Sequence, residues 1–467
     1  MRRFMMAIGW ILIAVSARAD DPEAPVMGNL MRFSLTPAGA GARAAGMANS
    51  FTALADDGTA ASWNPAGLAQ LEKPEASVVF SASGQSIEND AAQARSGPGV
   101  YSPYRMSYNR GSFDFASMAF PFALGGKPVT LQVSWQRAYR LWFHSPATIM
   151  ESLPSGPGAL IHSRTDLDGS IGFFSLAGGV RLTERALVGA SLNFWSGDWS
   201  MGTSILDTPA GVPPPNSQIL SFRQWNHISG TNYNIGILLL YPKASVGLVY
   251  RSAFHANYHF NTRLASNLPN GGQTSSDYAT TLRFPRQISA GVAWKPTDTW
   301  TLALDLTQIQ WSRMEIQGVT GAFPPLNFLD FLPASTTTTR DTLAFNAGAE
   351  YLWLRPKAVI PLRFGLAYDP QGGRDPWRGD PVNYYVLALG TGYNTNAWKL
   401  DAAVQYRWAN FHSSSYIEPA SIAQTPRTPD AYGPVHTAEW RVSFSVIYRM
   451  NESSGMNRFF HKAFVGP

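Results

Sequence analysis

The 467-residue sequence contains no cysteine, which excludes disulfide bonds, thiol catalysis and thiolate-bound metals. Charged residues are scarce as well: they make up 14 % of the chain, whereas a soluble globular protein carries about 25 %. Beyond the N-terminus no apolar run approaches the ~20 residues of a membrane-spanning helix. A deficit of charge without long apolar runs is unusual for a helical membrane protein. It is expected where every second residue faces lipid.

The N-terminus has the features of a secretory signal. Arg2 and Arg3 precede an apolar run over 4–15, and an A-x-A cleavage motif follows at 17–19. The run is too short for a spanning helix, so a signal peptide over 1–19 is favoured over a single membrane anchor. Cleavage of this peptide removes three arginines, Arg2, Arg3 and Arg18, which contribute to the formal charge of +5. No basic run with interleaved aromatics remains, so nucleic acid is not a predicted partner.

From Glu75 onward the hydrophobic period is two, which indicates β-strands. In 398–408 one face carries Trp, Leu, Val and Tyr, and the other carries Lys, Asp, Gln and Arg; 439–448, 343–353 and 129–136 repeat this scheme. Aromatic residues lie at the ends of these segments. Transmembrane strands have ~9–11 residues and such aromatic ends, whereas strands of a soluble sandwich have about five or six residues. The pattern therefore predicts a transmembrane antiparallel β-barrel.

Short and long connections alternate along the chain, as in outer-membrane barrels. The hairpins predict about fourteen strands, and this even number places both ends of the barrel on the short-turn side, in the periplasm. The predicted strands are 75–84, 111–122, 129–143, 169–182, 186–201, 227–240, 244–260, 282–295, 299–313, 341–354, 360–368, 383–394, 397–408 and 437–449.

One predicted strand breaks the alternation. Its outward set runs from Trp300 to Leu306 and resumes at Ile309 and Trp311, which indicates a slip of one residue near Thr307. Such a slip is usually repaired by a β-bulge. Two interpretations stay open: a local kink, or a defect of the wall beside a ligand path.

Nothing in the sequence indicates an enzyme. The eight histidines come with no G-x-S-x-G elbow and no carboxylate cluster. His227 and Ser229 share one strand face, which chance supplies easily. Gly39–Gly46 lacks the spacing of a dinucleotide loop, and no strand precedes it. The sequence therefore predicts no catalytic residue, no cofactor and no metal site.

The predicted inner face is only modestly polar, less so than in a general diffusion pore. Some of its charged residues are expected to satisfy one another as ion pairs. The predicted polar residues of the lumen are Asp305, Glu350, Lys399, Asp401, Arg407 and Arg441.

One long outer loop, 318–335, is strongly apolar. A loop of this kind marks a binding surface or a lid; the alternative is a loop folded over its own small core or touching lipid. The residues predicted to capture a ligand are Phe323, Leu326, Phe328, Leu329 and Phe331.

The segment before the first strand, 41–75, is rich in small residues, which let a short segment fit a confined space. Pro65 disfavours helix at Asn64 and fixes a turn there. The adjacent aspartates are expected to cap backbone groups or to pair with bases of the lumen. The predicted gating residues are Asp56, Asp57, Asn64, Pro65, Ala66 and Gly67.

Three segments resemble the FadL/TodX family of outer-membrane transporters for long-chain fatty acids and hydrophobic hydrocarbons. Gly41–Glu75 looks like the N-terminal hatch of that family. Phe284–Met314, which ends in Trp311-Ser312-Arg313, is similar to its mid-barrel hairpin, and Gly365–Asp369 matches in style.

The resemblance implies a division of the chain and a mode of transport. Residues 20–74 would form an extension and a hatch inside the lumen, 75–449 the barrel, and 450–467 a tail. Hydrophobic molecules would be captured at apolar outer loops, pass the hatch and leave sideways into lipid of the Gram-negative outer membrane, without energy coupling. The expected partners are a hydrophobic small molecule and outer-membrane lipid, and the expected state is a monomer.

Two departures keep an alternative open. The chain does not end on an aromatic residue, and Gly41–Asp57 is also similar in style to PorV-like barrels, which serve protein secretion or surface attachment. A scaffold or shuttle in secretion is therefore the second hypothesis. No basic residue maps onto a carboxylate site, so the resemblance supports hydrophobic cargo more directly than fatty acid.

Overall fold

The protein is described by a computed structural model. It describes residues 36–37, 39–89, 99–101, 104–151, 160–208, 218–267, 272–317, 326–327, 339–375, 379–415 and 431–450. The expected signal peptide lies outside these residues, as does the tail beyond Met450. Among the described residues, no helix is long and apolar enough to cross a membrane.

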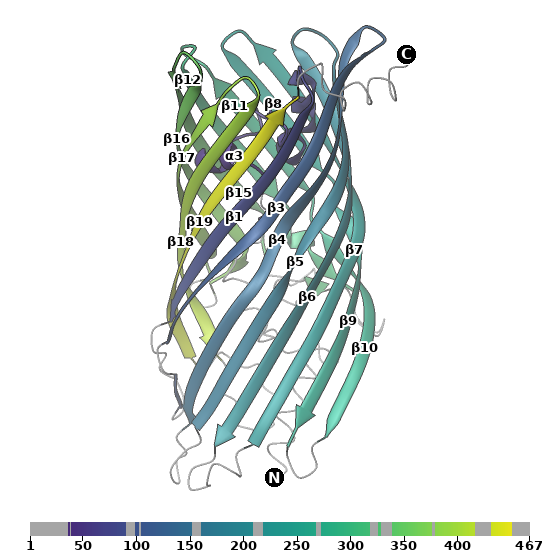
Figure 1. Ribbon diagram of the computed structural model, residues 1–467. Coiled ribbons are helices and arrows are strands. Elements are labelled where there is room, and N and C mark those ends of the chain that lie inside the picture. The colour runs from purple at the N-terminus through teal and green to yellow at the C-terminus, as the bar shows by residue number, and fades with distance from the viewer. Residues whose placement is uncertain are drawn as a thin grey trace.

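The described strands form one antiparallel sheet that closes on itself, because β1 pairs with both β3 and β19 (Figure 1). β8 with β9 and β10 with β11 each make one interrupted span, and β2, β13 and β14 are short pieces. The wall therefore has fourteen spans, as the sequence predicts. The strands are β1 (Glu75–Asn89), β2 (Gly99–Tyr101), β3 (Tyr104–Leu124), β4 (Lys127–Glu151), β5 (Leu160–Arg181), β6 (Ala186–Thr208), β7 (Gln218–Tyr241), β8 (Ala244–Arg251), β9 (Phe254–Ser266), β10 (Gln273–Phe284), β11 (Gln287–Trp294), β12 (Trp300–Ile309), β13 (Glu315–Ile316), β14 (Leu326–Asn327), β15 (Thr342–Leu354), β16 (Val359–Arg374), β17 (Pro381–Asn394), β18 (Trp398–Ser415) and β19 (Ala431–Arg449).

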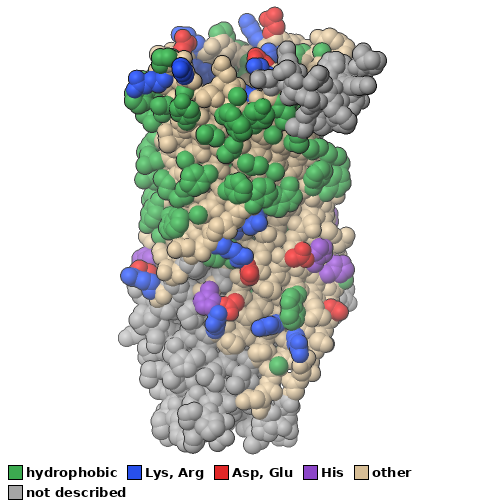
Figure 2. All heavy atoms as spheres, in the orientation of Figure 1, with side chains coloured by type: hydrophobic (Ala, Val, Ile, Leu, Met, Phe, Trp, Pro, Cys, Tyr) green, Lys and Arg blue, Asp and Glu red, His purple; other side chains and the backbone are tan. Residues whose placement is uncertain are grey.

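The outside of the barrel carries a belt of apolar side chains near the short-turn end, and charged side chains lie beyond it on both sides (Figure 2). The predicted alternation is confirmed: Trp398, Val404 and Tyr406 are exposed, while Asp401 and Gln405 are buried. In water such a belt would be an aggregation surface, whereas in a bilayer it faces hydrocarbon. The belt thus places the barrel in a membrane.

A segment before β1 fills the lumen at the short-turn end. This luminal segment, 39–74, contains three short helices: α3 (Ala42–Gly46), α4 (Ala60–Trp63) and the 3-10 helix η1 (Pro65–Gln70). It hydrogen-bonds to inward-facing groups all around the wall, on β3, β7, β8, β12, β15, β18 and β19. Small residues are required here, since a Cβ on Gly46 would lie 2.9 Å from the backbone of Gly390 in β17.

The predicted slip in β12 is wrong. Pairing of β12 with β11 and β15 keeps one register through Ile309. Ile309 and Trp311 are buried and face inward; the chain then turns through the 3-10 helix η3 (Trp311–Arg313). Their apolar character has another cause: they belong to an apolar cluster inside the outer half of the lumen.

Candidate functional site: a sealed lumen, an aromatic cavity and an open seam

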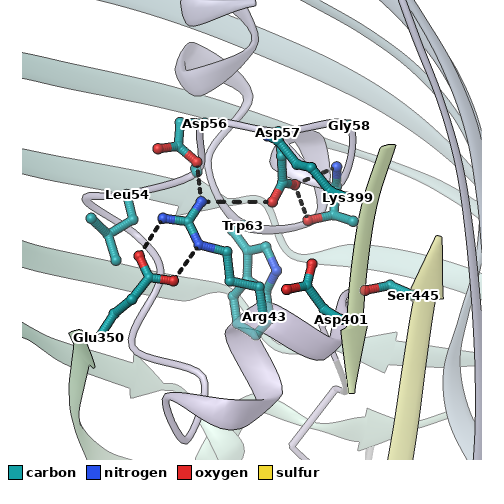
Figure 3. A network of polar contacts seen from close by, with 12 residues as sticks. Arg43, Leu54, Asp56, Asp57, Gly58, Trp63, Glu350, Lys399, Asp401 and Ser445 are labelled. Carbon is teal, nitrogen blue, oxygen red and sulfur yellow. Dashed lines mark hydrogen bonds and ion pairs between the residues drawn. The ribbon is translucent and has the colours of Figure 1, made fainter. Parts of the chain in front are cut away.

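The luminal segment is tied to the wall by Arg43 (Figure 3). Its guanidinium pairs with Asp56, lies 3.9 Å from Asp57 Oδ2, and donates to both carboxylate oxygens of Glu350 on β15 at 2.9 and 3.0 Å. Burial opposes the charge of Arg43, but Asp56 and Glu350 raise its pKa well above the ordinary value. Burial likewise acts against a charged Asp56, yet Arg43 holds the pKa of that carboxyl below its usual range.

The ion pairs continue along the inner face of the wall, from strand to strand. Arg363 on β16 is fully buried and donates to Glu350 at 2.6 Å and to Asp401 on β18 at 2.7 Å. Lys399 Nζ lies 3.8 Å from Glu75 Oε1, which also accepts from Arg449 at 3.0 Å. Removing one partner from such a network leaves a buried charge uncompensated and costs about 3–5 kcal/mol. The network therefore holds the luminal segment and the wall as one unit.

Two further side chains fix the segment on the other side of the lumen. Asp305 on β12 accepts the backbone N–H groups of Phe51 and Thr52, each at 2.8 Å. The side chain of Asn64 donates to the carbonyl of Thr52 at 3.0 Å and to that of Ile237 in β7 at 3.1 Å. Asn64 has an extended backbone and caps η1. Both contacts close the lumen toward the short-turn end.

The residues predicted to gate are buried within this closure. Asp57 accepts from the N–H and hydroxyl of Thr59; Pro65 and Ala66 pack against the wall at Gly236 of β7, where a Cβ would collide with them; and a Cβ on Gly67 would meet the carbonyl of Ala55. These contacts favour an anchoring role. A gating role for Asp56, Asp57, Asn64, Pro65, Ala66 and Gly67 stays a prediction.

On the long-connection side of the luminal segment lies a cavity of about 200 Å³. Trp63, Ser62 and Thr52 form part of its lining from the luminal segment. One side is aromatic and the other carries charged groups from β16, β18 and β19. The aromatic residues are Tyr139, Phe173, Trp195, Phe254 and Phe284; the charged ones on the other side are Asp369, Arg407, Glu439 and Arg441, and Arg251 of β8 and Asp305 of β12 also line the cavity.

The aromatic side is one end of a longer apolar column inside the barrel. Trp195 lies 4.7 Å from Phe173 and 5.2 Å from Phe254, between ring centroids. Farther toward the long connections, Tyr258 and Phe260 continue the column. Polar atoms in it are paired: Trp195 Nε1 donates to Asn232, and Tyr258 Oη donates to Asn226 at 2.6 Å. One side of the outer half of the lumen is thus lined by packed apolar side chains.

Beside the cavity, the wall opens between two neighbouring strands. β3 and β4 pair only from Leu124–Lys127 to Phe115–Gln136; beyond that point β3 stays with β1 and β4 with β5 (Figure 1), until the end of β4 pairs with β2 at Ile149–Glu151. An irregularity marks the opening on each strand, at Asp114 in β3 and at Ala138 in β4, where the register shifts. Bulges of this kind bend a strand and end its pairing. We call this unpaired stretch the seam.

Sequence reasoning placed some of these residues and missed others. Asp305, Glu350, Lys399 and Asp401 lie against the luminal segment, whereas Arg407 and Arg441 line the cavity. Arg43 and Arg363 were missed, although Arg43 is the one basic residue in the small-residue stretch 39–55. Of the predicted capture residues, Phe323, Phe328, Leu329 and Phe331 lie outside the described residues, and Leu326 belongs to β14.

A closed barrel with a lipid-facing belt and a lumen plugged by its own N-terminal segment defines a class of outer-membrane transport barrels. The chain matches the family model "Outer membrane protein transport protein (OMPP1/FadL/TodX)" over residues 34–420, and it belongs to this family. Its members are transport proteins of the outer membrane, which confirms the predicted location and a non-enzymatic role.

Solved structures share the fold at low identity. A FadL homologue of Pseudomonas aeruginosa is 14 % identical with a TM-score of 0.63, covering 90 % of this chain and 100 % of its own. The P. putida toluene transporter TodX is 12 % identical with a TM-score of 0.57, covering 88 % and 99 %. The Ralstonia pickettii toluene transporter TbuX is 15 % identical with a TM-score of 0.53, also covering 88 % and 99 %. No curated protein matches the chain.

Proposed function

We propose that this protein is a passive channel for the uptake of hydrophobic small molecules, such as long-chain fatty acids and alkylaromatic hydrocarbons. Apolar outer loops would collect the ligand, the aromatic column would carry it to the cavity, and the seam would release it sideways into the membrane. The luminal segment then acts as the hatch. The observation that carries this proposal is an aromatic cavity that ends on an anchored plug and adjoins unpaired wall.

The physical chemistry favours this route. An apolar molecule gains free energy in the aromatic column, about 25 cal/mol per Å² of buried apolar surface. It would lose that gain by entering the periplasm, but not by entering lipid. Ion pairs and hydrogen bonds tie the hatch to the wall on several strands, whereas at the seam no backbone pairing has to break and the strands are joined by side-chain ion pairs such as Arg140 to Asp114. The toluene transporters among the solved structures support hydrophobic cargo of this kind.

The test is uptake of radiolabelled oleate and of toluene by cells with and without the protein. The absence of cysteine allows a second arm. Ser112→Cys places a thiol in the seam, and Ser107→Cys places one on the outward face of the same strand. Modification with a bulky maleimide should stop uptake through Ser112→Cys and spare Ser107→Cys. Uptake that does not depend on the protein would refute transport, and equal inhibition of both variants would refute lateral release.

A further inference from the structure

Arginine side chains gather at the seam. Arg110 comes from β3, and Arg137 and Arg140 from β4, while Arg441 reaches the same place from β19. A small pocket lies among them, which we call the seam pocket. It is lined by Ser83, Arg110, Ser112, Arg137, Arg140, Trp142 and Gly169.

The carboxylates nearby do not balance these four guanidinium groups. Asp114 accepts from Arg140 at 2.5 Å and from Arg441 at 3.3 Å. Asp168 on β5 pairs with Arg110, and Glu439 lines the neighbouring cavity. Within the described part of the chain, these three acids face four arginines. The seam pocket therefore carries a positive excess.

Arg137 accounts for this excess. Its guanidinium forms no hydrogen bond or ion pair with a described residue, whereas Arg110, Arg140 and Arg441 each pair with a carboxylate. Its Nε, like those of Arg140 and Arg441, is shielded from solvent without an acceptor. The contact recorded for its guanidinium is the Trp135 ring, 5.9 Å from the ring centroid. A shielded donor without an acceptor is unfavourable, and buried polar groups in folded proteins are nearly always paired. An anion in the seam pocket would supply the missing acceptor.

The position of the pocket fits a molecule in transit. Along β4, Gln136 and Tyr139 line the lumen cavity, whereas Arg137, Arg140 and Trp142 line the seam pocket, so one bent strand borders both. On the lipid side, the rings of Phe113 and Trp135 stack with centroids 5.4 Å apart. A head group held by Arg137 would therefore sit between an aromatic cavity and an aromatic, lipid-facing surface.

We propose that the seam pocket binds the carboxylate of an amphiphile as it crosses the wall, with Arg137 as the principal contact. This inference rests on the proposed function and narrows it: an acid with a long apolar tail is preferred over a neutral molecule of the same tail. A guanidinium binds a carboxylate through two parallel N–H donors, which a neutral alcohol cannot match. A lipid phosphate offers similar chemistry, so the test separates the two sources.

The experiment measures equilibrium binding of oleate and oleyl alcohol to the purified protein in a neutral detergent. Arg137→Gln should weaken oleate binding about tenfold, as expected for one lost charge-assisted contact, and change oleyl alcohol binding less than about twofold. Arg137→Lys keeps the charge and should recover part of the loss. The matched control is Arg105→Gln on β3, the other strand of the seam, because Arg105 is exposed on the outer face and pairs with Glu88.

The possible outcomes distinguish binding of a ligand carboxylate from binding of a membrane phosphate and from the absence of head-group selectivity. Selective loss of oleate binding supports the inference. Equal loss of both ligands, or of neither, overturns it while leaving hydrophobic uptake intact. Loss of bound lipid A from Arg137→Gln with unchanged oleate binding would assign the pocket to a membrane phosphate and also overturn it. If the native protein binds neither oleate nor oleyl alcohol, the proposed function fails first.

Discussion

Replacing Arg43 with alanine should loosen the hatch without preventing the barrel from forming. The substitution removes two donors to Glu350 of β15 and the pair with Asp56, but Arg43 itself lies outside the strands of the wall. Loss of one partner in a buried network costs about 3–5 kcal/mol. The low end applies here, since Glu350 keeps its 2.6 Å bond to Arg363 and the Asp56 side chain is 30 % exposed, so water can hydrate it.

About 3 kcal/mol corresponds to a roughly 100-fold rise in the population of displaced hatch, because every 1.4 kcal/mol is tenfold. Single-channel recording in planar bilayers measures this population as the frequency of ion-conducting openings. Arg43→Lys keeps the charge but loses the paired N–H donors to Glu350. Its opening frequency should lie between those of the native protein and Arg43→Ala. Arg185→Ala, in an exposed short turn, is the control.

Two results would refute the reasoning. Openings as rare in Arg43→Ala as in the native protein, at an unchanged melting temperature, would mean that the ion pairs do not hold the hatch. A variant that never reaches the folded barrel would mean that Arg43 serves assembly instead of closure, provided that Arg43→Lys fails to fold as well.

Two further predictions concern pH and the aromatic column. Because the pKa of Asp56 lies below its ordinary value of 3.8, its ion pair stabilises the hatch above that pH and is lost as the pH falls below it; openings should become more frequent in acid, and Arg43→Ala should show less of this response. Equal acid responses would assign the effect to other carboxylates. Trp195→Ala should lower toluene uptake by up to about tenfold, given ~0.5–1.5 kcal/mol per aromatic contact. Trp398→Ala, on the lipid face, should not, and equal loss in both would point to a general defect of the barrel.

The spans could be predicted because lipid imposes the alternation. Beyond the apolar belt, the alternation of apolar and polar residues disappears from the sequence, although the strands remain paired. Sequence analysis therefore begins the fourth strand at 169, whereas β5 begins at Leu160, and it ends the first strand at 84, whereas β1 ends at Asn89. Hydrogen bonds hold these extensions, and hydrogen bonding leaves no hydrophobic pattern.

The interior was harder to predict, for two physical reasons. The usual barrel pattern is apolar outside and polar inside, so inward-facing Ile309 and Trp311 looked like a slip of register. In addition, the ion pairs of the hatch join residues far apart in the sequence: Arg43 and Glu350 are 307 positions apart. No local pattern reports such a pair.

The different linings of the two halves of the lumen explain why this barrel needs few charged residues. Toward the short turns, charge and small residues hold the luminal segment, and Arg43 and Arg363 each pair with at least two carboxylates. Toward the long connections, the lining is aromatic, and ion-pair partners are absent for one described guanidinium of the seam, that of Arg137. Because the luminal segment fills the short-turn half of the lumen, an apolar ligand would have no exit through water there. Under the proposed function, the seam, with the unpaired guanidinium of Arg137, would be the place where the channel distinguishes apolar ligands by their head groups.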